Sequence, residues 1–175
     1  MSAIKIGDMN DRPKLKIPLE THDLILEIIN ITLLVGIWLY VIINYSNLPE
    51  TIPTHFNAKG EPDDTGSKII LWILPVISLA TFGLIYFISK KPHIHNYMVN
   101  INQENAFKNY KLSCRFLRYT NLFCLFLFLA IVYQTVELAK GHNPNILRTP
   151  FLIFTLVFPF IGIAIILYYQ KKINS

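Results

Sequence analysis

Four long apolar stretches constrain the fold of this chain more than any other feature of its sequence. A helix that crosses a hydrocarbon core of ~30 Å needs about 20 predominantly apolar residues. Four segments reach that length, at about residues 24–45, 69–89, 116–136 and 151–169. Because only 15% of the 175 residues are charged, a polar shell that could bury four such helices in water is lacking. The sequence predicts an all-α bundle of four transmembrane helices, formed by residues 1–175 as a single integral membrane domain.

The distribution of Lys and Arg predicts the orientation of the bundle, because cytoplasmic loops are enriched in these residues. Twelve of the 16 lie in the leader (1–23), in the loop 90–115 with its flanks, or in the C-terminal tail. We therefore expect cytoplasmic termini, a cytoplasmic loop at 90–115 and an extracytoplasmic loop at 46–68. The long first apolar run favours a retained helix over a cleaved signal peptide. Topology accounts for the net charge of +5, and no nucleic-acid partner is expected.

Ionisable residues inside two of the apolar stretches predict an intramembrane polar layer. Glu27 lies in the first helix and Arg118 in the third, and each precedes an asparagine by three residues, Asn30 and Asn121. That spacing places each asparagine on the face of its charged neighbour. Since an unpaired charge in the bilayer is costly, we expect a Glu27–Arg118 ion pair with an Asn30–Asn121 contact beside it. We interpret the layer as holding two helices together; a proton or ion pathway is the alternative.

The loop 90–115 contains a basic stripe at helical spacing. We expect a helix that starts near Asn102 and continues into the third span, with the stripe touching lipid phosphates. His93 and His95 form a His-x-His pair, a weak metal-site pattern without a neighbouring cysteine or carboxylate. The stripe consists of Lys108, Lys111, Arg115 and Arg118.

The loop 46–68 is longer than a simple connection between two helices, and such loops are usually functional. Asn57 opens a turn whose fourth residue is Gly60, with the asparagine side chain capping its own backbone. The alternating residues ahead of that turn predict a short hairpin. His55 and Asp63 are placed to form a charge-assisted hydrogen bond across it. A structural lid over the helix ends is the favoured interpretation, and a cation site completed by Glu61 or Asp64 is the alternative.

The segment from Leu48 to Lys68, followed by a helix with an early proline, resembles a bacterial integral-membrane family of unknown function. That domain also forms the N-terminal half of the sporulation-delay toxin immunity proteins. The resemblance covers about residues 24–90 and implies a multi-pass protein of the bacterial cytoplasmic membrane that meets a peptide toxin or envelope component. The motif positions that carry it are Pro49, Pro53, His55, Asn57, Gly60, Asp63, Gly66, Ser67 and Lys68.

Three functional hypotheses follow. The sequence lacks nucleophile-elbow, zinc-protease, P-loop and dinucleotide fingerprints, so we expect a non-enzymatic protein without cofactor or bound metal. The leading hypothesis is a membrane protein whose ordered outer loop binds an external ligand. The first alternative is a small transporter or channel subunit that encloses a path by forming an oligomer. The second is an enzyme accessory that uses His55 and Asp63 at the outer face.

Overall fold

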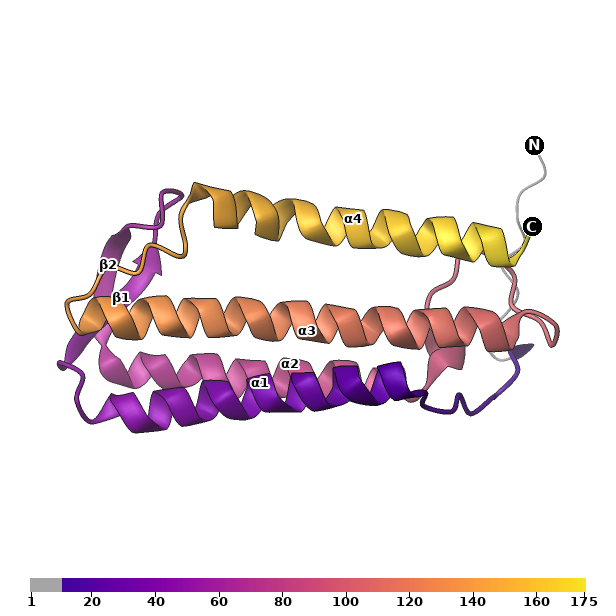
Figure 1. Ribbon diagram of the computed structural model, residues 1–175, viewed down its shortest axis with the longest axis horizontal. Coiled ribbons are helices and arrows are strands. Elements are labelled where there is room, and N and C mark those ends of the chain that lie inside the picture. The colour runs from indigo at the N-terminus through magenta and orange to yellow at the C-terminus, as the bar shows by residue number, and fades with distance from the viewer. Residues whose placement is uncertain (1–10) are drawn as a thin grey trace.

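Four long helices dominate the computed structural model, which describes residues 11–175 (Figure 1). They are α1 (Thr21–Tyr45), α2 (Ile73–Ser89), α3 (Ala106–Ala139) and α4 (Thr149–Ile173). A 3-10 turn, η2 (Lys68–Trp72), leads directly into α2. With that turn included, all four helices are long and apolar enough to cross a membrane. The four predicted spans are therefore confirmed, and the chain is a multi-pass membrane protein.

The core lies among α1, α2 and α3, with α3 at the centre of the bundle. Figure 1 shows α4 on the side of α3 that faces away from α1. It packs against α3 through aromatic rings, including Phe123 and Phe158, whose centroids lie 4.7 Å apart. The side chains of α4 are largely exposed and would meet lipid tails in a bilayer. The buried core is apolar and comprises Leu34, Ile37, Val41, Leu48, Ile52, Leu71, Leu125, Val132 and Val136.

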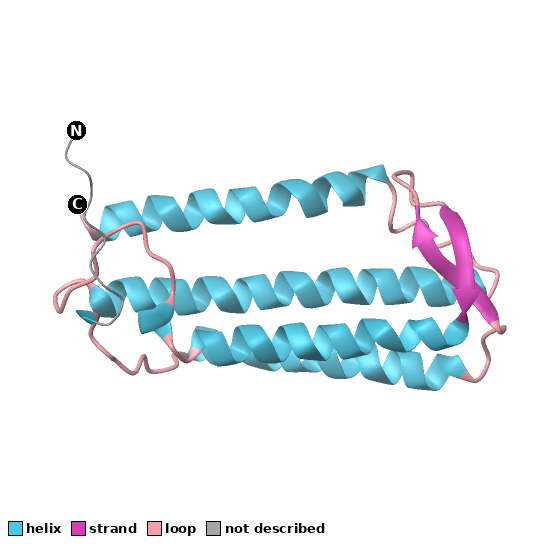
Figure 2. Ribbon diagram, turned by 180° about the vertical axis from the view of Figure 1, so that it is seen from behind, coloured by secondary structure: helices cyan, strands magenta, loops and turns pink. Residues whose placement is uncertain are grey.

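A short antiparallel hairpin joins α1 to η2, which confirms the hairpin expected in the loop 46–68 (Figure 2). Its strands are β1 (Thr51–Phe56) and β2 (Pro62–Ser67). Ile52, only 1% exposed, anchors β1 in the core of the bundle. The pairing shifts register on both sides of His55, so β1 does not keep the strict alternation that its sequence suggests.

The third helix begins at Ala106, ten residues before the expected span and close to the helix start expected near Asn102, so the loop 90–115 shrinks to residues 90–105. At 34 residues, α3 measures about 50 Å and extends beyond a hydrocarbon core. Its first turns are stabilised by packing on the chain ahead of α1, where the Tyr110 hydroxyl donates to the Pro13 carbonyl at 2.9 Å. Asn102 accepts hydrogen bonds from the backbone of Glu104 and Asn105 just before the helix starts.

Pro75 leaves α2 unbroken because it occupies the first turn, where its missing N–H would have no intrahelical partner. The second helix therefore needs no bend at this proline. In α4, by contrast, Pro159 lies within the helix.

The end of the bundle opposite the hairpin is closed by the loop 90–105. Arg12 donates to the carbonyl of His95 at 2.7 Å, and Tyr97 and Tyr110 are buried beside it. His95 is buried, with Nε2 2.9 Å from the Ile88 carbonyl and Nδ1 2.5 Å from the Ser113 hydroxyl. Because a carbonyl only accepts, Nε2 carries the proton and Nδ1 accepts from the serine. Both ring nitrogens are thus used in packing the loop.

The buried ring of His95 makes the stability of this end depend on pH. Burial lowers the pKa of His95 below its ordinary value of 6.5, so the unfolded chain binds this proton more readily than the folded protein. The stabilisation is complete above that value and is lost as pH falls toward the folded-state pKa. We expect the melting temperature in detergent micelles to fall between about pH 7 and about pH 5, and to fall less in His95→Gln.

The matched control is His93→Gln, because His93 is half-buried and belongs to the same loop. This variant should keep the pH dependence of the wild-type chain. Equal pH dependence in the wild type and His95→Gln would contradict the assignment of the effect to His95.

Candidate functional site

The tip of the hairpin is a turn capped by Asn57. Its Oδ1 accepts hydrogen bonds from the backbone N–H groups of Lys59 at 2.8 Å and Glu61 at 3.1 Å. The Gly60 N–H donates to the Asn57 carbonyl at 2.9 Å. The turn and cap that the sequence predicts are therefore present, and they make the tip an ordered structure.

Gly60 lets this tip dock on the connection between α3 and α4. Its φ of +78° is favourable only for glycine, and a Cβ placed there would lie 2.1 Å from the Leu147 carbonyl oxygen. The Thr149 hydroxyl donates to the Ala58 carbonyl at 3.2 Å across the same contact. The hairpin, which connects α1 to α2, is consequently also attached to the start of α4.

Other motif residues attach the hairpin to the helix ends. The Ser67 hydroxyl caps η2 by accepting from the Ile69 N–H at 3.5 Å. Lys68 pairs with Glu50 at 2.9 Å, donates to the Leu48 carbonyl at 3.3 Å and lies over the ring of Tyr45. Gly66 lies so close to β1 that a Cβ would be 3.0 Å from the Thr54 methyl carbon. These residues have structural roles.

His55 and Asp63 are exposed residues of the motif that bond to each other across the hairpin. His55 Nδ1 lies 2.5 Å from Asp63 Oδ1, the hydrogen bond expected across the hairpin, with side chains 69% and 42% exposed. Such a surface pair contributes at most about 1 kcal/mol to stability. Glu61 and Asp64 form hydrogen bonds elsewhere in the hairpin, and within residues 11–175 no cluster of three potential metal ligands forms. The pair therefore remains accessible to a ligand.

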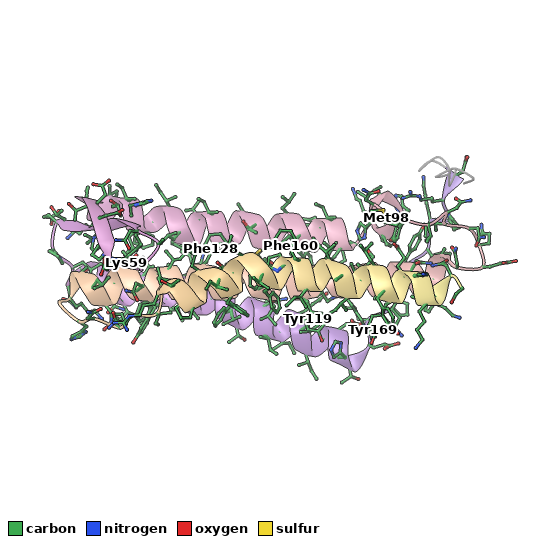
Figure 3. All side chains as sticks on the ribbon, turned by 90° about the horizontal axis from the view of Figure 1, so that it is seen from above. Lys59, Met98, Tyr119, Phe128, Phe160 and Tyr169 are labelled. Carbon is green, nitrogen blue, oxygen red and sulfur yellow. The ribbon has the colours of Figure 1, made fainter. Side chains whose placement is uncertain are left out.

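A pocket of about 510 Å³ lies beneath the hairpin, between the start of α2, α3 and the start of α4. Residues 52–57 of β1 and the turn form one wall, so Pro53, His55 and Asn57 lie at its edge. Figure 3 shows Lys59 at this end of the bundle and Met98 at the opposite end. The remaining lining is mostly apolar, with two threonines, and comprises Ile70, Leu71, Ile73, Leu74, Leu127, Ile131, Thr135, Leu147, Phe151, Leu152 and Thr155.

At the opposite end, acids of α1 and its cap pair with bases of α3. Glu20 bonds to Lys111 and, at 2.5 Å, to Arg115, and these contacts lower the pKa of the Glu20 carboxyl below its ordinary value. Asp23 Oδ1 lies 2.9 Å from Arg115 Nε. We refer to these contacts, continued below by Glu27 and Arg118, as the charge ladder. The paired residues follow the same order along α1 and α3, which shows that the two helices run parallel.

Glu27 and Arg118 form the inner step of the charge ladder. Arg118 Nε donates to Glu27 Oε1 at 3.1 Å, so the predicted ion pair is present, and Lys90 reaches the same oxygen at 3.4 Å. Of the expected contact between Asn30 and Asn121, the described residues show a shared cavity but no direct hydrogen bond. Instead, Asn30 donates to the Arg118 carbonyl and Asn121 to the Phe82 carbonyl, which brings α2 into the polar layer.

Three of the four bases of the stripe face protein, which corrects their interpretation as a lipid-phosphate contact, while Lys108 is exposed. Lys111, Arg115 and Arg118 bind acids of α1 because pairing offsets the cost of charge near the hydrocarbon core. Glu20 and Asp23 were not anticipated from the sequence. Glu20, Asp23 and Glu27 are spaced by three and four residues and the three bases by four and three, so both sets span the same length of one helix face, and this complementarity was the available signal.

Two comparisons with known proteins find a similarity to part of the chain. Residues 32–79, which include the hairpin, match a family model described as a domain of unknown function, DUF1648. A 62-residue stretch is 45% identical to an uncharacterized protein of Archaeoglobus fulgidus. That match covers 35% of this chain and 34% of the archaeal protein. No solved structure matches. The similarity supports a shared domain of unknown function and extends to an archaeon, and neither match includes an immunity protein.

Removing the inner base of the charge ladder should destabilise the bundle. We expect Arg118→Met to lower the free energy of unfolding by about 3 kcal/mol, because Glu27 and Asp23 lose a buried partner. The control, Lys108→Met, changes an exposed base of the same helix and should alter it by less than about 0.5 kcal/mol. Denaturant titration in micelles measures both. Equal effects would show that the ladder contributes little.

Alanine at Gly60 should detach the hairpin tip from the α3–α4 connection. Gly141→Ala is the matched control, since Gly141 has φ +87° but open space around its Cβ position. We expect about 1 kcal/mol of destabilisation at Gly141, from backbone strain alone, and more than about 2 kcal/mol at Gly60. Limited proteolysis within residues 57–62 reports detachment directly. Similar values for both variants would mean that the contact with Leu147 is not stabilising.

Proposed function

We propose that this protein is a non-enzymatic membrane receptor for a cationic amphipathic peptide, which it binds at the hairpin end of the bundle. The observation that carries the proposal is the pocket of about 510 Å³ beneath the hairpin. Mostly apolar pockets of this size with a few polar groups are typical ligand sites. Apolar side chains of the peptide fill the pocket, while His55 and Asp63 meet its polar groups at the edge.

Charge favours a cationic ligand. The exposed acids of the hairpin are Glu61, Asp63 and Asp64, and the exposed lysine of its tip is Lys59. The hairpin, which forms one wall of the pocket, therefore has more exposed acids than exposed lysines. Cationic amphipathic peptides that attack membranes combine the two features that this site complements, basic residues and an apolar face. Sequestering such a peptide would protect the cell, in keeping with the resemblance to toxin immunity proteins.

The proposed orientation places the hairpin on the extracytoplasmic face of the cytoplasmic membrane, in a bacterial cell. The end opposite the hairpin contains most of the lysines and arginines, as expected for the cytoplasmic side. A peptide arriving from outside the cell would then meet the hairpin first.

The arrangement favours a receptor over the two alternatives. Between the charge ladder and the hairpin, the core consists of apolar side chains such as Leu34, Ile37 and Leu125, which oppose an ion path through a single chain. His55 and Asp63 form a hydrogen-bonded pair that is open to solvent. A catalytic group would instead be preorganised in a site that excludes water. Binding is the activity that both the pocket and its edge support.

A survival assay tests the proposal. Sensitive bacteria expressing the protein should tolerate about tenfold more of at least one cationic amphipathic helical peptide of about 20–30 residues. Ile131→Trp, which fills the pocket, should abolish the protection, as should His55→Ala with Asp63→Ala. The control Ile43→Trp alters a side chain of α1 that is 69% exposed and should retain it. Unchanged sensitivity to every peptide of the panel would refute the receptor.

Orientation is checked in the same cells by labelling. Cys114 and Cys124 are first replaced by alanine, and single cysteines are introduced at the exposed positions Glu61 and Gln103. An impermeant maleimide added outside intact cells should label Glu61→Cys and not Gln103→Cys. The reverse pattern would place the hairpin in the cytoplasm and exclude an external peptide.

A further inference from the structure

Two amide oxygens inside the bundle accept no hydrogen bond from any residue in the described range 11–175. They are Asn30 Oδ1 and Asn121 Oδ1, and their residues are 2% and 3% exposed. Both residues line a cavity of about 20 Å³ where α1, α2 and α3 meet. A polar atom without a partner in hydrocarbon costs several kcal/mol, so these oxygens require a donor.

The direction of each amide group is set by its protein contacts. Asn30 Nδ2 lies 3.2 Å from the Arg118 carbonyl oxygen, and Asn121 Nδ2 lies 3.4 Å from the Phe82 carbonyl oxygen. Since a carbonyl only accepts, each amide presents its NH₂ group to the backbone and its oxygen away from it. Rotating either amide by 180° would place two acceptors together, so both oxygens remain in need of a donor.

We propose that this cavity is a binding site for a single water molecule, which donates one hydrogen to Asn30 Oδ1 and the other to Asn121 Oδ1. One water needs about 10–15 Å³ of such space and two to four polar partners. The cavity therefore holds one water and excludes a second. Arg118 and Glu27 also line it, and the guanidinium N–H groups of Arg118 can donate to the water oxygen.

The surrounding charges favour a neutral occupant over a cation. Glu27 is the carboxylate that lines the cavity, and it already binds Arg118 at 3.1 Å and Lys90 at 3.4 Å. Asp23, the next carboxylate of α1, is bound to Arg115 and Arg118. A bound cation would face these bases and find two amide oxygens where hard cations take six or more oxygen ligands. Water satisfies both oxygens without added charge.

The proposed water joins three helices at one point. Asn30 belongs to α1 and Asn121 to α3, and Asn121 also bonds to the backbone of α2. A shared water therefore couples the two asparagines energetically, although no direct hydrogen bond links them. This inference concerns the interior of the bundle and does not depend on the proposed peptide receptor.

The direct test is a structure of the wild-type chain at a resolution that shows ordered solvent. We expect one solvent peak within about 2.7–3.2 Å of both Oδ1 atoms. An unoccupied cavity, or a peak that contacts neither oxygen, would overturn the proposal. This measurement needs no variant and stays decisive if substitutions impair folding.

A double-mutant cycle tests the coupling. Asn30→Leu and Asn121→Leu should each lower the melting temperature in micelles by about 4 °C, because each leaves the other oxygen with a weakly held water. The double variant should lose less than the sum. If no shared water links the two oxygens, the two losses should simply add, which would contradict the coupling.

Salt identity separates water from a metal ion. The melting temperature of the wild-type chain should be the same in sodium chloride and choline chloride at equal ionic strength. A higher value in sodium that is absent from Asn30→Leu would identify a cation at this cavity and reject the water. Equal values in both salts, together with the solvent peak, support the water.

Discussion

The cost of an unpaired charge in hydrocarbon governs the architecture of this bundle. Arg118 is buried and Glu27 half-buried within membrane-spanning helices, and the two bind each other, with Lys90 joining them from the end of α2. These contacts hold α1 and α3 side by side and parallel, and they fix the axial register between them. Once that register is set, the ends of α1 and α2 lie close enough for the hairpin to span them.

The hairpin motif is mainly a structural device, and its functional groups are few. Asn57 orders the tip, Gly60 admits the α3–α4 connection, and Lys68 attaches the second strand to the helix ends. His55 and Asp63 remain exposed on this scaffold. The hairpin is therefore an ordered platform that presents these two side chains beside the pocket.

The position of α4 shapes the pocket more than it shapes the core. The helix contacts α3 through stacked aromatic rings and supplies Phe151, Leu152 and Thr155 to one wall of the pocket. Its link to the hairpin runs through Gly60 and Leu147. Since α4 buries little of its own surface against the other helices, a shift of this helix would widen or narrow the pocket at low energetic cost. The proposed ligand site thus lies between the three-helix core and its most loosely packed helix.

Local features of the sequence determined the four spans, the Asn57 turn and the pairing of Glu27 with Arg118. Each depends on the length of an apolar run, on turn chemistry, or on the cost of an isolated charge. All three can be recognised in the sequence without knowing which helices pack together. The partners of Glu20 and the bond from Asn121 to α2 depended on which helices pack together. They join residues far apart in the chain, so no local pattern specifies them.

The pocket is the clearest case of a feature decided only by tertiary structure. It is assembled from β1, α2, α3 and α4. Most of its wall residues are apolar, and in the sequence they cannot be distinguished from side chains that face lipid. The interruption of strand alternation around His55 turns consecutive residues of β1 toward one cavity. Sequence determined that the chain spans a membrane with an ordered hairpin; packing determined that the hairpin covers a pocket, because a cavity is a property of the surfaces that meet around it.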